Sequence, residues 1–290
     1  MFSTAFTYMS SAVDLGPDLL LDLYPNARVA YSVRKLKKAY TGKCLRVRRS
    51  SDEAEKDISF LNGVLNETEL TDFVGANNGF VVKFYDQSGN GNDAVKTTAA
   101  DQPRIVNSGT IETINGKPAV RTLQGTTRQN MDLTTNFVQG QWSQYFVTKK
   151  TDGYTAAGIS RRTTGVTSAL GLVYATDQKM YNVYASTLPN WYVTRNTSAL
   201  SNTTDPKILM AASFTSGNEG KIWQNGSLMT NIEYDGSTTD SITFNSLFLY
   251  SDGVGLQTDA FFSEVVYWNG DQSSNAVAIQ NNSNSYFSIY

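Results

Sequence analysis

Short runs of β-branched and aromatic residues, separated by turns of small polar residues, fill most of the chain after residue 80. Such runs are typical of buried strands. The clearest are residues 80–85, 144–148, 171–175, 180–185, 207–214, 220–224, 246–250 and 260–268. Asn225-Gly226 is the strongest hairpin signal, because both positions of its turn favour positive φ. Many short strands at close spacing predict an all-β sandwich or jelly roll rather than an alternating α/β fold.

A few short helices are expected beside the strands. The spacing of Val29, Val33, Leu36 and Tyr40 predicts a helix over residues 26–40, with the basic side chains on its solvated face. We prefer that interpretation of the basic stretch 34–49 to a binding patch.

Two further helices are predicted nearer the middle and the end of the chain. Asn66, followed three residues later by Glu69, has the pattern of a capping box, and Gly75 is placed to end that helix. Another helix is expected to start near Ser274, before a final strand over residues 286–290.

The domain organisation is predicted to be simple. Residues 1–25 have the character of an arm that packs on its own domain or docks on a neighbouring subunit, which favours a homo-oligomer. Residues 26–290 form one domain, since no repeat or low-complexity linker divides them.

Composition excludes several classes of function. The chain has no histidine and one cysteine, so it has neither a His-based catalytic triad nor a zinc cluster. A net charge of −2 gives no field that would gather nucleic acid. No apolar run is long enough to span a membrane, and we expect no signal peptide and synthesis in a cytoplasm.

One ten-residue segment resembles a known enzyme family. Residues 85–94, Tyr-Asp-Gln-Ser-Gly-Asn-Gly-Asn-Asp-Ala, resemble a motif in the catalytic domain of α-L-arabinofuranosidase B, glycoside hydrolase family 54. Residues 45–52, 102–106 and 116–120 fit the same pattern, so that the resemblance covers residues 28–122.

The second half of the chain looks like a different group of proteins. Residues 221–226 and 261–268 resemble strands of laminin-G-like domains, which implies a concanavalin A-like jelly-roll sandwich. Chains that combine both halves with an opening like residues 24–36 look like structural proteins of tailed phages. The resemblance implies a virion component that is extracellular after release.

The catalytic pair of the arabinofuranosidase family carries over only in part. A retaining glycosidase uses two carboxyl groups about 5 Å apart. Asp252 matches the place of the family's acid, but Leu170 is the position best aligned with its nucleophilic Glu, and no Glu occurs between Glu112 and Glu219. We therefore predict no catalytic residues and interpret Asp252 as a turn residue.

Two groups of residues remain as candidate ligand sites. The first comprises Asp86, Gln87, Asn90, Asn92 and Asp93, whose oxygens suit sugar hydroxyls or, through Asp86 and Asp93, a Ca²⁺ ion. We favour turn chemistry for this loop, and therefore no metal and no cofactor.

The second group is Trp191-Tyr192, which follows Pro189-Asn190. These rings suit a sugar-stacking platform, although packing in the core or at a subunit interface is the preferred interpretation.

Three functional hypotheses follow from these observations. The first is a non-enzymatic virion structural protein: a capsid decoration, head-fibre or tail-associated domain that contacts other virion proteins. The second is a carbohydrate-binding module that reads cell-surface polysaccharide. The third is an arabinofuranosidase-like glycosidase.

Overall fold

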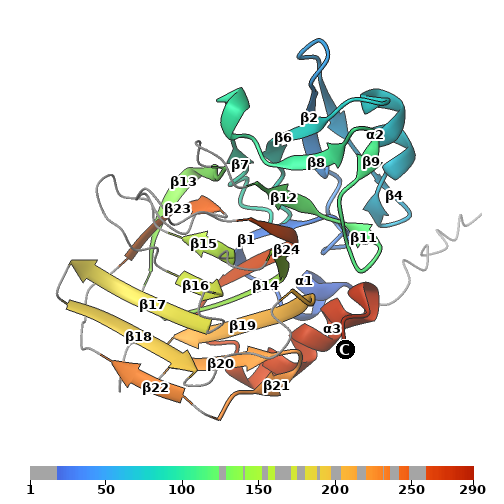
Figure 1. Cartoon of the computed structure of the whole chain (residues 1–290). Coiled ribbons are helices and arrows are strands. Elements are labelled where there is room, and N and C mark those ends of the chain that lie inside the picture. The colour runs from blue at the N-terminus through green and yellow to red at the C-terminus, as the bar shows by residue number, and fades with distance from the viewer. Residues whose placement is uncertain are drawn as a thin grey trace, which may run out of the picture.

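The structure is a computed structural model that describes residues 18–123, 129–139, 141–151, 156–160, 171–174, 180–187, 190–196, 204–213, 220–230, 232–235, 242–247 and 259–290. Strands dominate these ranges, and helices are few and short (Figure 1). The fold is an all-β sandwich, as predicted.

The elements of the first half are α1 (Leu20–Leu23), β1 (Ala27–Ser32), β2 (Leu45–Arg49), β3 (Glu55–Ile58), β4 (Phe60–Leu61), β5 (Val64–Leu65), α2 (Glu67–Val74), β6 (Gly79–Phe84), β7 (Ala94–Val95), the 3₁₀ turn Ala99–Asp101, β8 (Arg104–Asn107), β9 (Thr110–Ile111), β10 (Thr113–Ile114), β11 (Lys117–Pro118), β12 (Val120–Thr122) and β13 (Met131–Gln139). Those of the second half are β14 (Trp142–Lys150), β15 (Ala156–Ser160), β16 (Gly171–Tyr174), β17 (Met180–Thr187), β18 (Asn190–Asn196), β19 (Lys207–Ser213), β20 (Gly220–Gln224), β21 (Ser227–Leu228), β22 (Ile232–Asp235), β23 (Ile242–Leu247), β24 (Ala260–Asn269), the 3₁₀ turn Ser273–Asn275 and α3 (Ala276–Phe287).

All strand pairings of the described residues are antiparallel. The hairpins β4–β5 and β10–β11 are separate two-stranded sheets, and the other strands form one hydrogen-bonded network. At its centre β14 pairs with β24 on one edge and with β19 on the other. The opposite edge of β24 pairs with both β1 and β12. From β12 the network runs through β8, β6 and β7 to β13, and then through β23, β15, β16, β17 and β18 to β22.

The centre of the sandwich is covered on both faces. On the inner face, Trp142 of β14 stacks on Tyr267 of β24 with 5.6 Å between ring centroids, and both rings contact Phe244 of β23. On the outer face, Ser283 of α3 reaches Glu264 of β24. Because helix and sheet cover opposite faces, every residue of β24 from Phe262 to Trp268 is buried.

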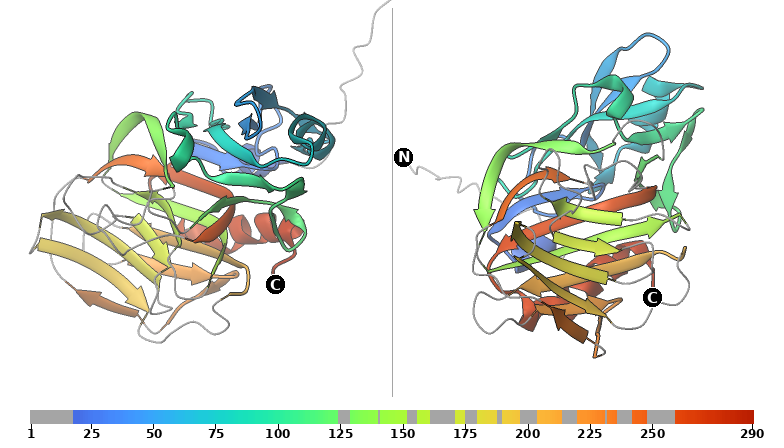
Figure 2. Two further views of the ribbon diagram at one scale, coloured as in Figure 1. Left: turned by 45° about the horizontal axis from the view of Figure 1, so that its top comes forward. Right: turned by 60° about the vertical axis from the view of Figure 1, so that its left-hand side comes forward.

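The segment coloured blue to teal, with β2, β6 and α2, lies at one end of the molecule, and the yellow strands β17 and β18 lie at the other (Figures 1 and 2). Leu20 of α1 and Phe287 of α3 belong to the same hydrophobic core. The backbone N–H of Leu21 also donates to the carbonyl of Leu36 at 2.8 Å. Residues 18–25 of the predicted arm therefore pack on the domain itself, whereas residues 1–17 lie outside the described residues.

Several local predictions are confirmed. The side chain of Asn66 accepts a hydrogen bond from the backbone N–H of Glu69 at 3.1 Å and so caps α2, and Gly75 follows with positive φ. In the β20–β21 turn Asn225 and Gly226 have φ of 50° and 76°, as a type I′ hairpin requires.

The helix predicted over residues 26–40 is wrong. Residues 27–32 form strand β1, in which Val29, Ala30 and Tyr31 are consecutively buried. A strand buried on both faces needs such a run, and pairing along the whole of β24 overrides the helical spacing. Residues 33–44 form a loop apart from isolated pairings and turns.

The strand predicted over residues 286–290 is also wrong. Helix α3 continues to Phe287, because Ile279, Ser283 and Phe287 recur at helical spacing on its buried face. Ser288, with φ of 51°, then ends the helix. No helix of the described residues has the length and apolar character needed to cross a membrane.

Candidate functional site

The loop between β6 and β7 holds the first group of sequence candidates. Asp86 is buried, and its carboxylate accepts hydrogen bonds from the backbone N–H groups of Ala30, Ser88 and Asn92 at 2.9, 2.9 and 3.0 Å. The Ser88 hydroxyl donates to the same carboxylate at 2.7 Å. Burial raises the pKa of Asp86 above its ordinary value, and these hydrogen bonds partly oppose that rise.

The three amides of the loop are engaged in the same way. Gln87 accepts from the backbone N–H of Leu36 and donates to the carbonyls of Ser32 and Arg34. Asn90 donates to two carbonyls at the start of β1, and Asn92 both donates to and accepts from the backbone of β13. Their polar atoms therefore join the loop to two strands, which favours the turn interpretation.

Asp93, the second acidic candidate, also has internal partners. Its carboxylate accepts from the backbone N–H of Asp86 at 3.0 Å and lies 3.2 Å from the ammonium of Lys83. Among the described residues, no three acidic or cysteine side chains gather where they could hold a metal ion. The Ca²⁺ alternative remains a prediction without a described ligand set.

The other sequence candidates can be placed only in part. Trp191 and Tyr192 lie on β18, where they pair with Ala185 and Tyr184 of β17. Their side chains lie outside what the structure describes, as do Asp252 and Leu170 altogether.

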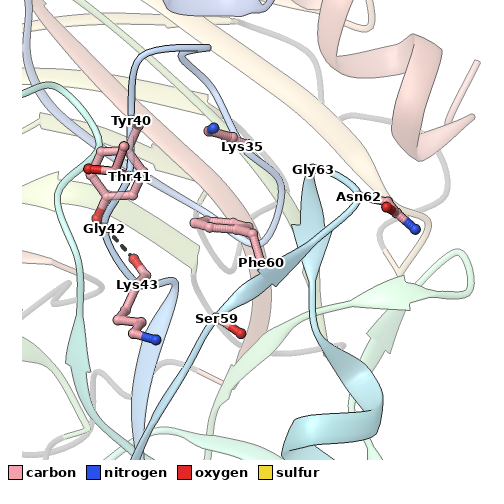
Figure 3. A pocket seen from close by; sticks show the side chains of 9 residues that line it. All are labelled: Lys35, Tyr40, Thr41, Gly42, Lys43, Ser59, Phe60, Asn62 and Gly63. Carbon is pink, nitrogen blue, oxygen red and sulfur yellow. Dashed lines mark hydrogen bonds between the residues drawn. The ribbon is translucent and has the colours of Figure 1, made fainter. Parts of the chain in front are cut away.

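The described residues form an open pocket of about 360 Å³ at the blue end of the molecule, between the loop 33–44 and the β4–β5 hairpin (Figure 3). Backbone hydrogen bonds join the two sides. The N–H of Lys35 donates to the carbonyl of Gly63 at 2.7 Å, and the N–H of Leu65 donates to the carbonyl of Val33 at 2.7 Å. The pocket lining comprises Lys35, Tyr40, Thr41, Gly42, Lys43, Ser59, Phe60, Asn62 and Gly63.

Two aromatic rings form the apolar part of the pocket. The rings of Tyr40 and Phe60 meet edge to face, with centroids 6.2 Å apart. The Tyr40 hydroxyl donates to the carbonyl of Lys43 at 2.9 Å, and burial raises its pKa, so the phenol stays protonated. A Cβ at Gly42 would overlap the Tyr40 ring and hydroxyl, so any larger residue at this position would have to displace the Tyr40 side chain.

The polar part of the pocket is cationic or neutral. Figure 3 shows the Lys35 and Lys43 side chains on either side of the Phe60 ring in that view, with Asn62 pointing away from the rings at the tip of the hairpin. The Lys35 ammonium donates to the carbonyl of Lys38 at 3.0 Å. None of the nine lining residues is Asp, Glu or His. Such a pocket can bind a ligand, but it offers neither the carboxylate nor the imidazole that general acid–base catalysis most often uses.

Sequence reasoning missed this pocket. The available signal was the basic stretch 34–49, which we assigned to a solvated helix face. Because residues 33–44 form a loop rather than a helix, Lys35 and Lys43 lie beside the two aromatic rings and not on a solvated helix face.

A second cluster of charged residues is buried between β1, β14, β24 and α3. The Arg34 guanidinium pairs with both oxygens of Glu264 at 2.7 and 2.8 Å, and Ser32 donates to the same carboxylate at 2.6 Å. The hydroxyls of Tyr145 and Ser283 also donate to it. Both carboxylate oxygens of Glu264 accept hydrogen bonds within the fold, and Glu264 does not line the pocket of Figure 3, so we interpret this cluster as structural.

Comparison with known proteins reveals what the chain is similar to. The family model described as alpha-L-arabinofuranosidase B, catalytic, matches residues 24–127, which include both the Asp86–Asp93 loop and the pocket. This confirms the resemblance noted in the sequence, over a little more than a third of the chain. No curated protein sequence matches the chain.

Solved structures extend the similarity to most of the chain. A family 54 α-L-arabinofuranosidase soaked with a cyclic sulfate inhibitor is 16% identical with a TM-score of 0.59, and an arabinofuranosidase complexed with arabinofuranosyl-alpha-1,2-xylobiose is 15% identical with a TM-score of 0.57. The chain has the arabinofuranosidase-like fold. Each match covers 88% of this chain but 62% of the enzyme, so the chain spans less than two thirds of either structure.

A more distant match is a receptor-binding domain. The receptor binding domain of botulinum neurotoxin D is 10% identical, covers 83% of this chain and 53% of its own, and has a TM-score of 0.50. At these identities the matches show the shared β-sandwich fold alone.

Proposed function

We propose that this chain is a non-catalytic structural protein of a phage virion that binds host-surface glycans through the pocket between the loop 33–44 and the β4–β5 hairpin. It acts as a capsid decoration, head-fibre or tail-associated domain, assembles as a homo-oligomer on the particle, and is extracellular after release.

The observation that carries the binding part of this proposal is the chemistry of the pocket. It combines two aromatic rings with ammonium, hydroxyl and amide groups, and it has no carboxylate. Aromatic faces pack on the C–H faces of sugars, while the polar groups select among hydroxyls and charges. A retaining glycosidase would need two carboxyl groups about 5 Å apart beside the bound sugar. The pocket therefore supports recognition rather than cleavage.

The virion part of the proposal is supported by the resemblance of residues 24–36, and of the two halves together, to tailed-phage structural proteins. The β-sandwich fold, shared with enzymes that act on arabinofuranosides and with a toxin receptor-binding domain, is compatible with a role at a particle surface.

Particle association and glycan binding are tested separately. Immunogold electron microscopy of source particles should place the protein on the particle, and light scattering should give the mass of an oligomer. Unlabelled particles and a monomeric mass would contradict the virion assignment, whatever the glycan results.

Glycan binding is tested with a bulky residue in the pocket. Thr41 is exposed and lines the pocket, whereas Thr113 is exposed on β10 outside it. We expect Thr41→Trp to abolish retention of host-surface polysaccharide, and Thr113→Trp to bind like the wild type. Equal retention by both variants would show that the pocket is not the glycan site.

A second candidate is a glycosidase, which the family match over residues 24–127 favours. Its test is turnover of 4-nitrophenyl α-L-arabinofuranoside by the wild type and by Asp252→Asn. We expect no turnover by either protein. Hydrolysis by the wild type that Asp252→Asn abolishes would establish the enzymatic alternative in place of our proposal.

A further inference from the structure

The unpaired positive charge of the described chain is concentrated in one loop. Arginine and lysine side chains elsewhere are generally neutralised by carboxylates, as in Arg46–Asp57 and Arg104–Glu112, or lie over aromatic rings, as Lys117 does over Tyr286. In the described residues Lys35, Lys37 and Lys43 have neither an ion-pair partner nor a ring contact, and all three belong to the loop 33–44.

Two of these three lysines line the pocket. Lys35 and Lys43 contribute to its wall, whereas Lys37 lies in the same loop without lining it. The Lys35 ammonium donates one hydrogen bond to the Lys38 carbonyl, and an ammonium group has three donors. The Lys43 side chain is exposed. Both ammonium groups can therefore turn towards an anion at the rim without breaking an ion pair of the fold.

The apolar wall restricts what kind of anion would bind. A free inorganic anion would leave the rings of Tyr40 and Phe60 uncovered, whereas a sugar ring carrying an acidic group covers them with its C–H face. The volume, about 360 Å³, lies in the range of about 300–1,000 Å³ typical of small-ligand sites.

We infer that the pocket binds an acidic oligosaccharide, with a sugar ring packed on Tyr40 and Phe60 and acidic groups at Lys35 and at Lys43, which lie on either side of the Phe60 ring. This inference rests on the proposed glycan-binding function and specifies its ligand class. Carboxylate and phosphate share the required chemistry, because lysine recognises either of them as a point charge.

The test uses isothermal titration calorimetry of the full chain with oligogalacturonate, with the same oligomer fully methyl-esterified, and with a phosphorylated hexose oligomer. Esterification removes the charge and keeps the sugar ring. We expect the acid to bind more tightly than its ester and binding to weaken with added salt. The ligand with the higher affinity, oligogalacturonate or the phosphorylated oligomer, shows whether the pocket prefers a carboxylate or a phosphate.

Matched variants locate the site. Lys35→Gln and Lys43→Gln should each weaken binding of the acid by about ten- to a hundredfold, as expected for loss of a charged hydrogen bond. Lys37→Gln removes the same charge from the same loop and should leave binding within about twofold, because Lys37 is half-buried outside the pocket lining and has no contact with the bound ligand.

Each outcome decides one point. Equal affinity for acid and ester, unchanged in Lys35→Gln and Lys43→Gln, would overturn the anionic inference while leaving glycan binding intact. An equal loss in Lys37→Gln would show diffuse attraction to the loop and would also overturn it. No binding of any saccharide would overturn both this inference and the glycan-binding half of the proposed function, whereas particle association would still be decided by immunogold labelling.

Discussion

Replacing Glu264 with glutamine should destabilise the protein far more than an ordinary surface substitution. The Glu264 carboxylate is 1% exposed and accepts from Arg34, Ser32, Tyr145 and Ser283. Glutamine supplies one acceptor oxygen in place of two and places an NH₂ group against donors. It also leaves the guanidinium of Arg34, 7% exposed, without a counter-charge.

The expected magnitude follows from that burial. Breaking a buried ion pair by removing one partner costs about 3–5 kcal/mol. At roughly 2–4 °C per kcal/mol for a domain of this size class, the melting temperature should fall by about 6–20 °C. Urea unfolding followed by circular dichroism measures the loss directly, and an unchanged m-value would show that the denatured state is the same.

Two matched variants test the reasoning. Asp57→Asn breaks the Arg46–Asp57 pair, whose side chains are 39% and 31% exposed, and should cost at most about 1 kcal/mol. The double variant Arg34→Met/Glu264→Leu removes both buried charges and should recover much of the loss. A Glu264→Gln cost as small as that of Asp57→Asn would refute the argument that burial makes this pair expensive to break.

The remaining predictions concern pH, the Asp86 loop, the pocket and a helix cap. Burial opposes ionisation of Glu264, but attraction to arginine and hydrogen bonding outweigh it and hold its pKa below the ordinary value. Its stabilisation is therefore present above about pH 4.3, and the stability gap between wild type and Glu264→Gln should close as pH falls below that value in urea titrations. Asp86→Asn should lower the free energy of unfolding by about 1–3 kcal/mol, because it leaves buried donors unsatisfied. Calorimetry should find saccharide binding unchanged in this variant. Lost binding with unchanged stability would show instead that the Asp86 loop binds the saccharide. Gly42→Ala should drive the Tyr40 ring into the pocket and thereby weaken binding of an acidic saccharide at least tenfold. A crystal structure of the variant with the Tyr40 ring unmoved would contradict this mechanism. Asn66→Ala should cost about 1 kcal/mol by removing the cap of α2, as thermal melts would show.

Local signals in the sequence predicted much of the fold. Asn225-Gly226 specifies its hairpin through backbone φ alone, and Asn66 caps α2 through a hydrogen bond three residues away. Both depend on neighbours in the chain, which a sequence displays directly.

The features that sequence reasoning missed depend on distant contacts. Val29 and Val33 have helical spacing, but β1 is set by its pairing with β24, from the other end of the chain. The pocket could not be predicted for the same reason: Tyr40 and Phe60 meet only because the hairpin bonds to the loop through Lys35 and Gly63. The candidates at Asp86 and Asn92 were chosen for oxygen content, and the sequence could not show that the backbone N–H groups of Ala30 in β1 and Thr135 in β13 use those oxygens.

The position of β24 in the chain affects how the protein folds during synthesis and whether a fragment of it can fold alone. Strands β1 and β12, which bracket most of the family-matched part of the chain, both form their ladders on the same edge of β24, and β24 is synthesised long after both of them. Until it leaves the ribosome, the early strands have exposed, unpaired edges. The N-terminal third is therefore not a transferable module, and an expressed fragment of residues 24–127 should aggregate unless a peptide carrying β24 is supplied with it.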